Sequence, residues 1–202
     1  MKGSAKNICI VMLFCFLSIT GYSQPAINSI ENYFGIPKNI QFENVDYTLS
    51  WSAHPNKVYF KQEYLPRGQN PDHFSNMLMI DFAEGDFTAK DVANNKIGTL
   101  QERKKTDPVC NYELIESPDG KEFILDFLMS VSANEKVNLV EWNCYHYKSY
   151  TDKAGHKGVV LYGISNRAYD DGVTPFLQNL PKQRKDIINA IIKFPIPEIQ
   201  IR

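Results

Sequence analysis

The fold is decided by residues 110–169, which read CNYELIESPDGKEFILDFLMSVSANEKVNLVEWNCYHYKSYTDKAGHKGVVLYGISNRAY. Four strand-like runs lie within this stretch, at 110–116, 122–131, 137–149 and 157–169. The first connection, Ser117-Pro118-Asp119-Gly120, is a turn signal, because proline presets one backbone dihedral and glycine accepts a positive φ. Strands joined by such short connections must be antiparallel neighbours. The stretch therefore predicts an antiparallel meander, and the run at 122–131, apolar on both faces, should be central and covered twice.

Upstream of the meander, two more runs alternate apolar with polar residues. They are Tyr47–Ala53 and Lys57–Leu65, and the residues between them, His54–Asn56, have the composition of a turn. Alternation with a period of two is typical of half-buried strands, so the pair predicts a hairpin. Shorter strands are expected at Ile40–Val45 and Met77–Ala83, after a leader at Pro25–Gly35.

Two longer segments have helical patterns. Thr88 and Asp91 form a capping box, and an apolar face follows it at Ala89, Val92, Ala93, Ile97 and Leu100. The second segment, 174–193, has a strong isoleucine stripe, and Pro181 is expected to break it. A short third helix is predicted at Asn70-Pro71, an Asn cap followed by proline at the first helical position.

These elements predict an α+β fold: an antiparallel sheet, a meander of about six to seven strands, with helices packed on it. The order is β-β-(α)-β-α-β-β-β-β-α, which resembles the PsbP/Mog1-like fold. This resemblance covers topology alone, so it implies no functional residue.

The N-terminus has the layout of a secretory signal peptide. Lys2 and Lys6 precede an apolar run at 8–19, and small or polar residues follow it. The run is shorter than the roughly 20 residues that a spanning helix needs, although an uncleaved anchor is the alternative. We therefore expect a signal peptide at 1–24, cleaved near Ser23 or Gln24, and a single α+β domain at 25–202. The product would be secreted or periplasmic, and the phrase at 51–55, WSAHP, also resembles small bacterial secreted proteins of unknown function.

Charge narrows the class of partner. Removing Lys2 and Lys6 lowers the basic residues from 22 to 20 against 23 acidic ones, which gives a formal net charge of −3. A slightly acidic domain argues against nucleic acid as the partner. The short basic runs at 103–105 and 182–185 are interpreted as solvated helix surface, with phosphate binding as the alternative. No segment after the signal peptide is long and apolar enough to span a membrane.

No catalytic or cofactor motif stands out. The four histidines show no metal-binding spacing, and the chain has no CxxC, GxSxG, GxGxxG or P-loop, so no metal site and no cofactor are predicted. His146, Glu141 and Asp126 are the weak candidates for acid-base chemistry, because catalytic groups need only converge in space. They carry the alternative hypothesis of a secreted or periplasmic hydrolase-like enzyme with dispersed catalytic residues.

The enriched residue is tyrosine, with 11 in the chain. Trp142, Tyr145 and Tyr147 lie in one aromatic run of the third meander strand and are the candidates for a binding surface. Preference of aromatic residues for strands explains the same run without any ligand. The first functional hypothesis is an exported, non-catalytic domain that binds an unknown protein or small molecule through a sheet face or groove.

The meander also makes a prediction about the two cysteines beyond the signal peptide, Cys110 and Cys144. An even pair in an exported chain is ordinarily interpreted as a disulfide. In the meander, however, a whole strand separates them, so they would lie at least roughly 9.5 Å apart across the sheet. A disulfide needs Cα atoms within about 7 Å, and we therefore predict two free thiols.

Overall fold

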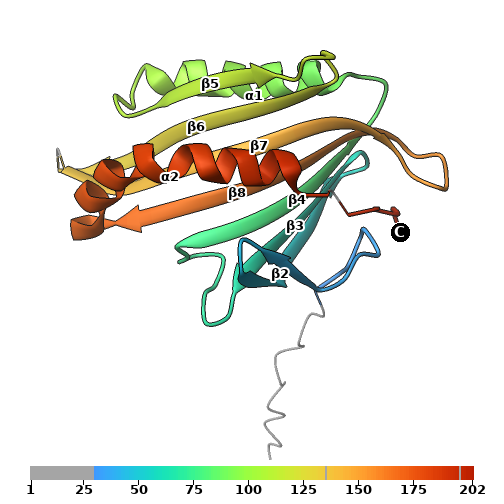
Figure 1. Ribbon diagram of the computed structural model, residues 1–202, viewed down its shortest axis with the longest axis horizontal. Coiled ribbons are helices and arrows are strands. Elements are labelled where there is room, and N and C mark those ends of the chain that lie inside the picture. The colour runs from blue at the N-terminus through green and yellow to red at the C-terminus, as the bar shows by residue number, and fades with distance from the viewer. Residues whose placement is uncertain (1–29, 135, 196) are drawn as a thin grey trace, which may run out of the picture.

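A computed structural model describes residues 30–134, 136–195 and 197–202, and the predicted signal peptide lies outside these residues. It contains an eight-stranded antiparallel sheet and two α-helices (Figure 1). The strands are β1 (Asn39–Phe42), β2 (Val45–Asn56), β3 (Tyr59–Pro66), β4 (Asn76–Glu84), β5 (Asn111–Glu116), β6 (Glu122–Ala133), β7 (Lys136–Thr151) and β8 (Lys157–Tyr169). The helices are α1 (Ala89–Lys104) and α2 (Val173–Lys193), with a 3-10 turn at Asp170–Gly172.

The strand order is β1-β2-β3-β4-β8-β7-β6-β5, which leaves β1 and β5 at the two edges. The predicted fold class, with a meander of six to seven strands, is therefore wrong: the sheet has eight strands and consists of two meanders. They join where β4 pairs with β8, in a register that runs from Asn76 opposite Asn166 to Glu84 opposite Gly158. This junction connects segments about 80 residues apart, and no turn signal in the sequence marks it.

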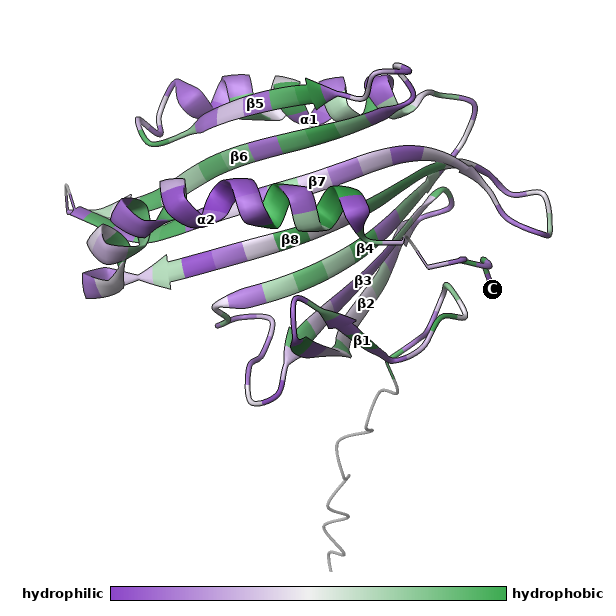
Figure 2. Ribbon diagram, in the orientation of Figure 1, coloured by the Kyte–Doolittle hydropathy of each residue, from purple (hydrophilic) through white to green (hydrophobic). Residues whose placement is uncertain are grey.

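One helix covers each face of the sheet. Figure 1 shows α2 in front of β7 and β8, with α1 behind the sheet near β5 and β6. Residues alternate between the faces, so along β7 Trp142 and Cys144 join the core under α2, whereas Tyr145 and Tyr147 join the core under α1. Apolar residues dominate β6 (Figure 2), and it is buried on both faces as predicted. It is nevertheless second from the edge, so the prediction of a central position is wrong.

Several local predictions are corrected by the structure. The hairpin between β2 and β3 turns at residues 57–58 instead of 54–56, and the Val58 amide donates to Asn56 Oδ1 at 3.0 Å. No helix forms at Asn70-Pro71, because Asn70 Oδ1 accepts from the amides of Asp72 and His73 and closes a tight turn instead. The predicted capping box of α1 is confirmed: Thr88 Oγ1 accepts from the Asp91 amide, and Asp91 accepts from the Thr88 amide.

The segments outside the sheet are part of the core. Phe34, predicted to lie in a leader, is fully buried, and its amide donates to Gln62 Oε1 at 3.1 Å. After α2 the chain returns along this segment, since the Gln200 amide donates to the Phe34 carbonyl and the Arg202 amide to the Tyr33 carbonyl. Residues 33–34 and 200–202 thus lie side by side.

Cys110 and Cys144 are both free thiols, as predicted. β5, β6 and β7 are consecutive neighbours, and the two cysteines belong to the cores on opposite faces of the sheet. Cys110 Sγ donates a weak hydrogen bond to the Leu100 carbonyl at 3.6 Å. Burial raises the pKa of the Cys144 thiol far above its usual value, so neither cysteine offers a ready nucleophile.

Candidate functional site

The three predicted acid-base residues do not form one site. Asp126 and His146 lie on the sheet face under α2, because Asp126 is opposite Cys144 and His146 is opposite Ile124 in the β6–β7 register. Side chains alternate between the two faces along a strand, and Glu141 is an odd number of residues away from His146 on β7. Its side chain therefore lies on the other face. No rearrangement short of a register change would bring Glu141 to Asp126.

The His146 side chain is buried and is bonded to Glu122. Its Nε2 lies 2.7 Å from Glu122 Oε2, and Lys148 Nζ lies 2.6 Å from the other oxygen of the same carboxylate. The imidazole is only 5% exposed. Burial lowers the pKa of His146, and the hydrogen bond that Glu122 accepts from the ring only partly opposes this, so the ring is mainly neutral at neutral pH.

Glu141 is also held by structural partners. Ser165 Oγ donates to one of its oxygens at 3.0 Å and Arg167 Nε donates to the other at 2.6 Å. The Arg167 guanidinium in turn lies 4.0 Å from the centre of the Phe74 ring. Glu141 therefore fixes Arg167 between β7, β8 and the loop that carries Phe74.

Asp126 forms the polar floor of a cleft between α2 and the β5–β7 end of the sheet. Trp142 Nε1 donates to Asp126 Oδ1 at 2.5 Å, and Arg184 Nε from α2 donates to the second oxygen. Arg184 Nη2 also donates to Glu113 Oε2 on β5 at 2.6 Å. Burial raises the pKa of Asp126, and the hydrogen bonds from Trp142 and Arg184 oppose that rise. The arginine thus joins the helix to two strands.

This α2 cleft has a volume of about 480 Å³. Its mainly apolar walls are formed by Tyr112, Leu128, Trp142, Leu177, Leu180 and Pro181. The prediction that Pro181 breaks or restarts the helix is wrong, because α2 is continuous through it. Since proline has no amide hydrogen, the Leu177 carbonyl loses its helical donor, and both residues line the cleft. A ligand there would meet apolar walls and the Arg184 guanidinium.

The aromatic residues predicted as a binding surface are divided between the two faces. Trp142 is 1% exposed and borders the α2 cleft, whereas Tyr145 and Tyr147 lie under α1. The Tyr145 ring packs edge-on against Phe127, with centroids 4.9 Å apart, and a Cβ added at Gly163 would lie 2.7 Å from the ring. Tyr145 and Tyr147 therefore serve mainly as core residues.

Two other kinds of feature, a metal site and a membrane-spanning helix, are not found in the described part of the chain. Within the described ranges, no three His, Cys, Asp or Glu side chains are grouped in a way that could hold a metal ion. In that same part of the chain, no helix has both the length and the apolar character needed to cross a membrane. The α2 cleft, where Asp126, Trp142 and Arg184 are joined by hydrogen bonds, is the candidate site.

Comparison with known proteins places the chain in a family. A family model matches residues 34–196, which is most of the chain. The chain belongs to this uncharacterised protein family. No curated protein matches it. Every residue named for the α2 cleft lies within the family region.

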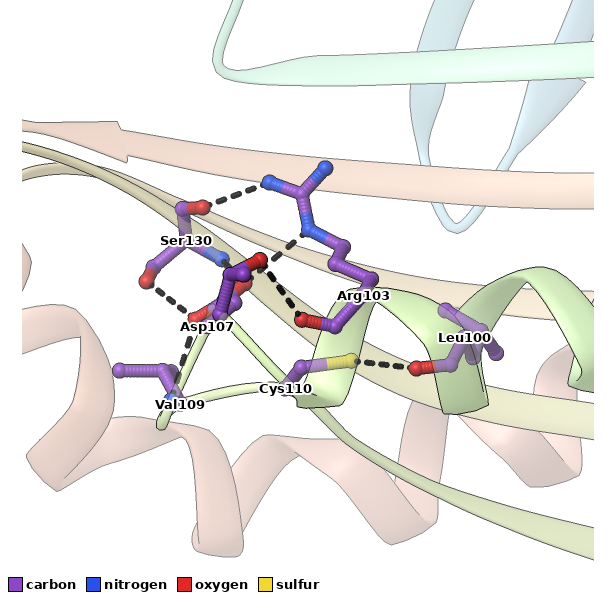
Figure 3. Close-up of polar contacts among 7 residues, drawn as sticks. Leu100, Arg103, Asp107, Val109, Cys110 and Ser130 are labelled. Carbon is purple, nitrogen blue, oxygen red and sulfur yellow. Dashed lines mark hydrogen bonds and ion pairs between the residues drawn. The ribbon is translucent and has the colours of Figure 1, made fainter.

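A buried carboxylate anchors α1 within the family region (Figure 3). Asp107 accepts from the Ser130 amide at 2.7 Å, from Ser130 Oγ at 2.7 Å and from Arg103 Nε at 3.1 Å. Arg103 Nη2 also donates to the Ser130 carbonyl at 2.6 Å. This Asp107 anchor ties the C-terminal end of α1 to β6, and it places the side chains that follow Arg103 beside β5.

The residues of α2 that build the site have no motif in the sequence. Arg184 lies in the basic run 182–185, whose charge predicts solvated helix surface. Leu177 and Leu180 contribute only to the apolar stripe of the helix, which does not indicate a cleft. The one available signal was the proline inside an otherwise helical pattern, which marks a helix with a free carbonyl.

Proposed function

We propose that this family member is an exported, non-catalytic binding domain, and that the α2 cleft receives a compact apolar group of its ligand. The observation that carries the proposal is a cleft of about 480 Å³ whose apolar walls surround the Asp126–Arg184 pair. Ligand sites typically combine apolar walls with a few placed polar groups.

Binding is favoured over hydrolysis because each candidate acid-base group already has a strong partner. Asp126 is neutralised by Arg184, His146 is bonded to Glu122, and Glu141 is bonded to Arg167 on the opposite face. A general base must reach its substrate proton within hydrogen-bonding distance. The resemblance in element order to the PsbP/Mog1-like fold stays a prediction and supplies no residue roles.

A fluorescent probe with apolar aromatic rings and one sulfonate should report on the cleft. We expect 1-anilinonaphthalene-8-sulfonate to quench Trp142 in a Trp51→Phe background, where Trp142 is the only tryptophan. Leu177→Phe should weaken probe binding at least about five-fold, because the larger side chain fills the cleft. The readout is the Trp142 emission titrated with the probe.

Val58→Phe is the matched control, since it adds similar volume at an exposed apolar position of the β2–β3 turn. Thermal melts of both variants would show whether each is folded. Equal probe affinity for Leu177→Phe and Val58→Phe would contradict a binding role for the cleft.

Export makes a separate prediction. If the first 24 residues are a signal peptide, mass spectrometry of the protein from a producing cell should find a mature N-terminus next to Ser23 or Gln24. The reason is that a signal peptidase cleaves after the apolar run. Full-length chain retained in a membrane fraction would argue for an uncleaved anchor instead.

A further inference from the structure

β5 is an edge strand with one open side. The Ser117 amide donates to the Glu122 carbonyl at 2.9 Å, so Ser117 faces β6 with its hydrogen-bonding groups. Antiparallel pairs alternate, which directs the backbone groups of Tyr112, Leu114 and Glu116 away from β6. Within residues 30–134, 136–195 and 197–202, no backbone partner meets these outward groups. Figure 1 shows β5 at the edge of the sheet, in front of α1.

Cavities flank β5 on both sides. On the α2 side, beyond the α2 cleft, a groove of about 430 Å³ is lined by Ile115, Arg184, Ile188 and Ile192. Ile192 is 48% exposed, so this groove offers apolar surface to a partner. On the α1 side, a second groove of about 460 Å³ is lined by Gln101, Lys104, Lys105, Asn111 and Tyr112. The side chains of a strand added to β5 would point alternately toward the groove on the α2 side and the groove on the α1 side.

The two basic runs of the sequence meet at this strand. Lys104 and Lys105 end α1 on one side of β5, and Lys185 lies on α2 on the other side. Lys105 pairs with Glu102, but in the described part of the chain Lys104, Lys182 and Lys185 have no carboxylate within ion-pair distance. The nearest polar partner of Lys104 is Asn111 Oδ1 at 3.4 Å. The groove on the α1 side is therefore lined by lysines and no carboxylate, whereas Glu113 and Glu116 of β5 are paired with Arg184 and Lys90.

We propose that β5 binds an extended peptide of alternating apolar and acidic residues as a ninth strand of the sheet. The outward amides and carbonyls of β5 pair with the peptide backbone. Its apolar side chains enter the grooves beside α2, and its acidic side chains meet Lys104 and Lys105. Backbone pairing supplies affinity in such strand addition, and the alternate pockets supply specificity. The inference rests on the proposed function, since an apolar side chain of the peptide is the group that the α2 cleft receives.

A second copy of the chain fits the edge less well than an acidic peptide. Antiparallel pairing of two β5 strands about Leu114 would set Tyr112 of one copy opposite Glu116 of the other. Lys90 lies 3.3 Å from Glu116, whereas Lys104 lies near Asn111. Each end of the interface would therefore bring Lys104 and Lys105 of one copy to the Lys90–Glu116 pair of the other, which offers these lysines no unpaired carboxylate.

The probe for this inference is a fluorescein-labelled, amidated octapeptide of alternating glutamate and valine, followed by fluorescence anisotropy with the full mature protein. We expect saturable binding that weakens as salt rises, and at least about ten-fold weaker binding of the lysine-valine counterpart. Two further peptides carry N-methyl groups on all glutamates or on all valines. One of the two should lose binding and the other should retain it, because a strand directs alternate amides to one edge.

Glu116→Pro and Glu116→Ala form the matched protein variants. Both variants remove the Glu116 side chain, but only proline also removes the backbone amide. Because this amide points away from β6, its removal breaks no hydrogen bond of the sheet, and the two variants should have the same melting temperature. We expect peptide affinity to fall at least about ten-fold more in the proline variant. Equal affinities would overturn the proposal.

Two other outcomes would also overturn it. If the octapeptide fails to bind while the naphthalene probe still reports on the α2 cleft, strand addition is wrong and the cleft proposal stands. If sedimentation shows a wild-type dimer that Glu116→Pro converts to a monomer, the occupant of the edge is a second copy.

Discussion

Replacing Asp107 with alanine should lower the free energy of unfolding by about 3–5 kcal/mol, a large loss for a domain of this size. The carboxylate accepts four hydrogen bonds, from the Ser130 amide, Ser130 Oγ, Arg103 Nε and the Val109 amide. Alanine would leave the buried Ser130 amide without a partner and would remove the carboxylate link between α1 and β6, so that only the Arg103 bond to the Ser130 carbonyl remains of the anchor. Urea unfolding, followed by tryptophan fluorescence, measures the change.

The pH dependence of this effect has a definite sign. Burial acts to raise the pKa of Asp107, but the hydrogen bonds from Ser130, Arg103 and Val109 outweigh it and hold the pKa below its usual range. A depressed folded-state pKa adds stability above the unfolded value of 3.8 and loses it as the pH falls further. The difference between wild type and Asp107→Ala should therefore shrink below about pH 4. Asp72→Ala, at an exposed loop position, is the control, and a loss under about 1 kcal/mol in Asp107→Ala would refute the anchor.

Replacing Asp81 with asparagine should stabilise the protein at neutral and alkaline pH, by up to about 3 kcal/mol. Asp81 is buried on β4, where Tyr59 Oη donates to one carboxylate oxygen at 2.5 Å. The other oxygen has no partner among the described residues. Burial raises the pKa of Asp81 from 3.8 to about 6, although Lys61 and the Tyr59 hydroxyl oppose the rise. Asparagine keeps an acceptor for Tyr59 and removes the buried charge.

The sign again follows from the shift. Because the folded-state pKa lies above the unfolded one, the folded protein takes up a proton on Asp81 between about pH 4 and 6. The stability that comes from the protonated acid is present below pH 4 and is lost as the pH rises through 6. Wild type and Asp81→Asn should therefore unfold alike at pH 4 and diverge by pH 8. A difference that stayed constant from pH 4 to 8 would show that Asp81 does not titrate in this way.

The strands and their local neighbours could be predicted from the sequence, because short connections permit only one arrangement. The turn at Ser117–Gly120 makes β5 and β6 antiparallel neighbours. The α1 helix begins where the Thr88–Asp91 capping box places it, and its buried residues Ala89, Ala93 and Leu100 lie on the predicted face. The separation of Cys110 from Cys144 follows from the same local order.

What the sequence alone determined is thus the identity of most elements, the β5–β8 meander and the free thiols. Only the tertiary structure decided that β4 pairs with β8, since long-range pairing depends on which faces of the whole sheet become buried. It also decided that Arg184 crosses from α2 to Asp126, 58 residues away, and that two basic runs flank β5. Side-chain contacts between distant segments have no period or spacing in the chain. They form because α1 ends beside β5 on one face of the sheet and α2 passes beside β5 on the other face.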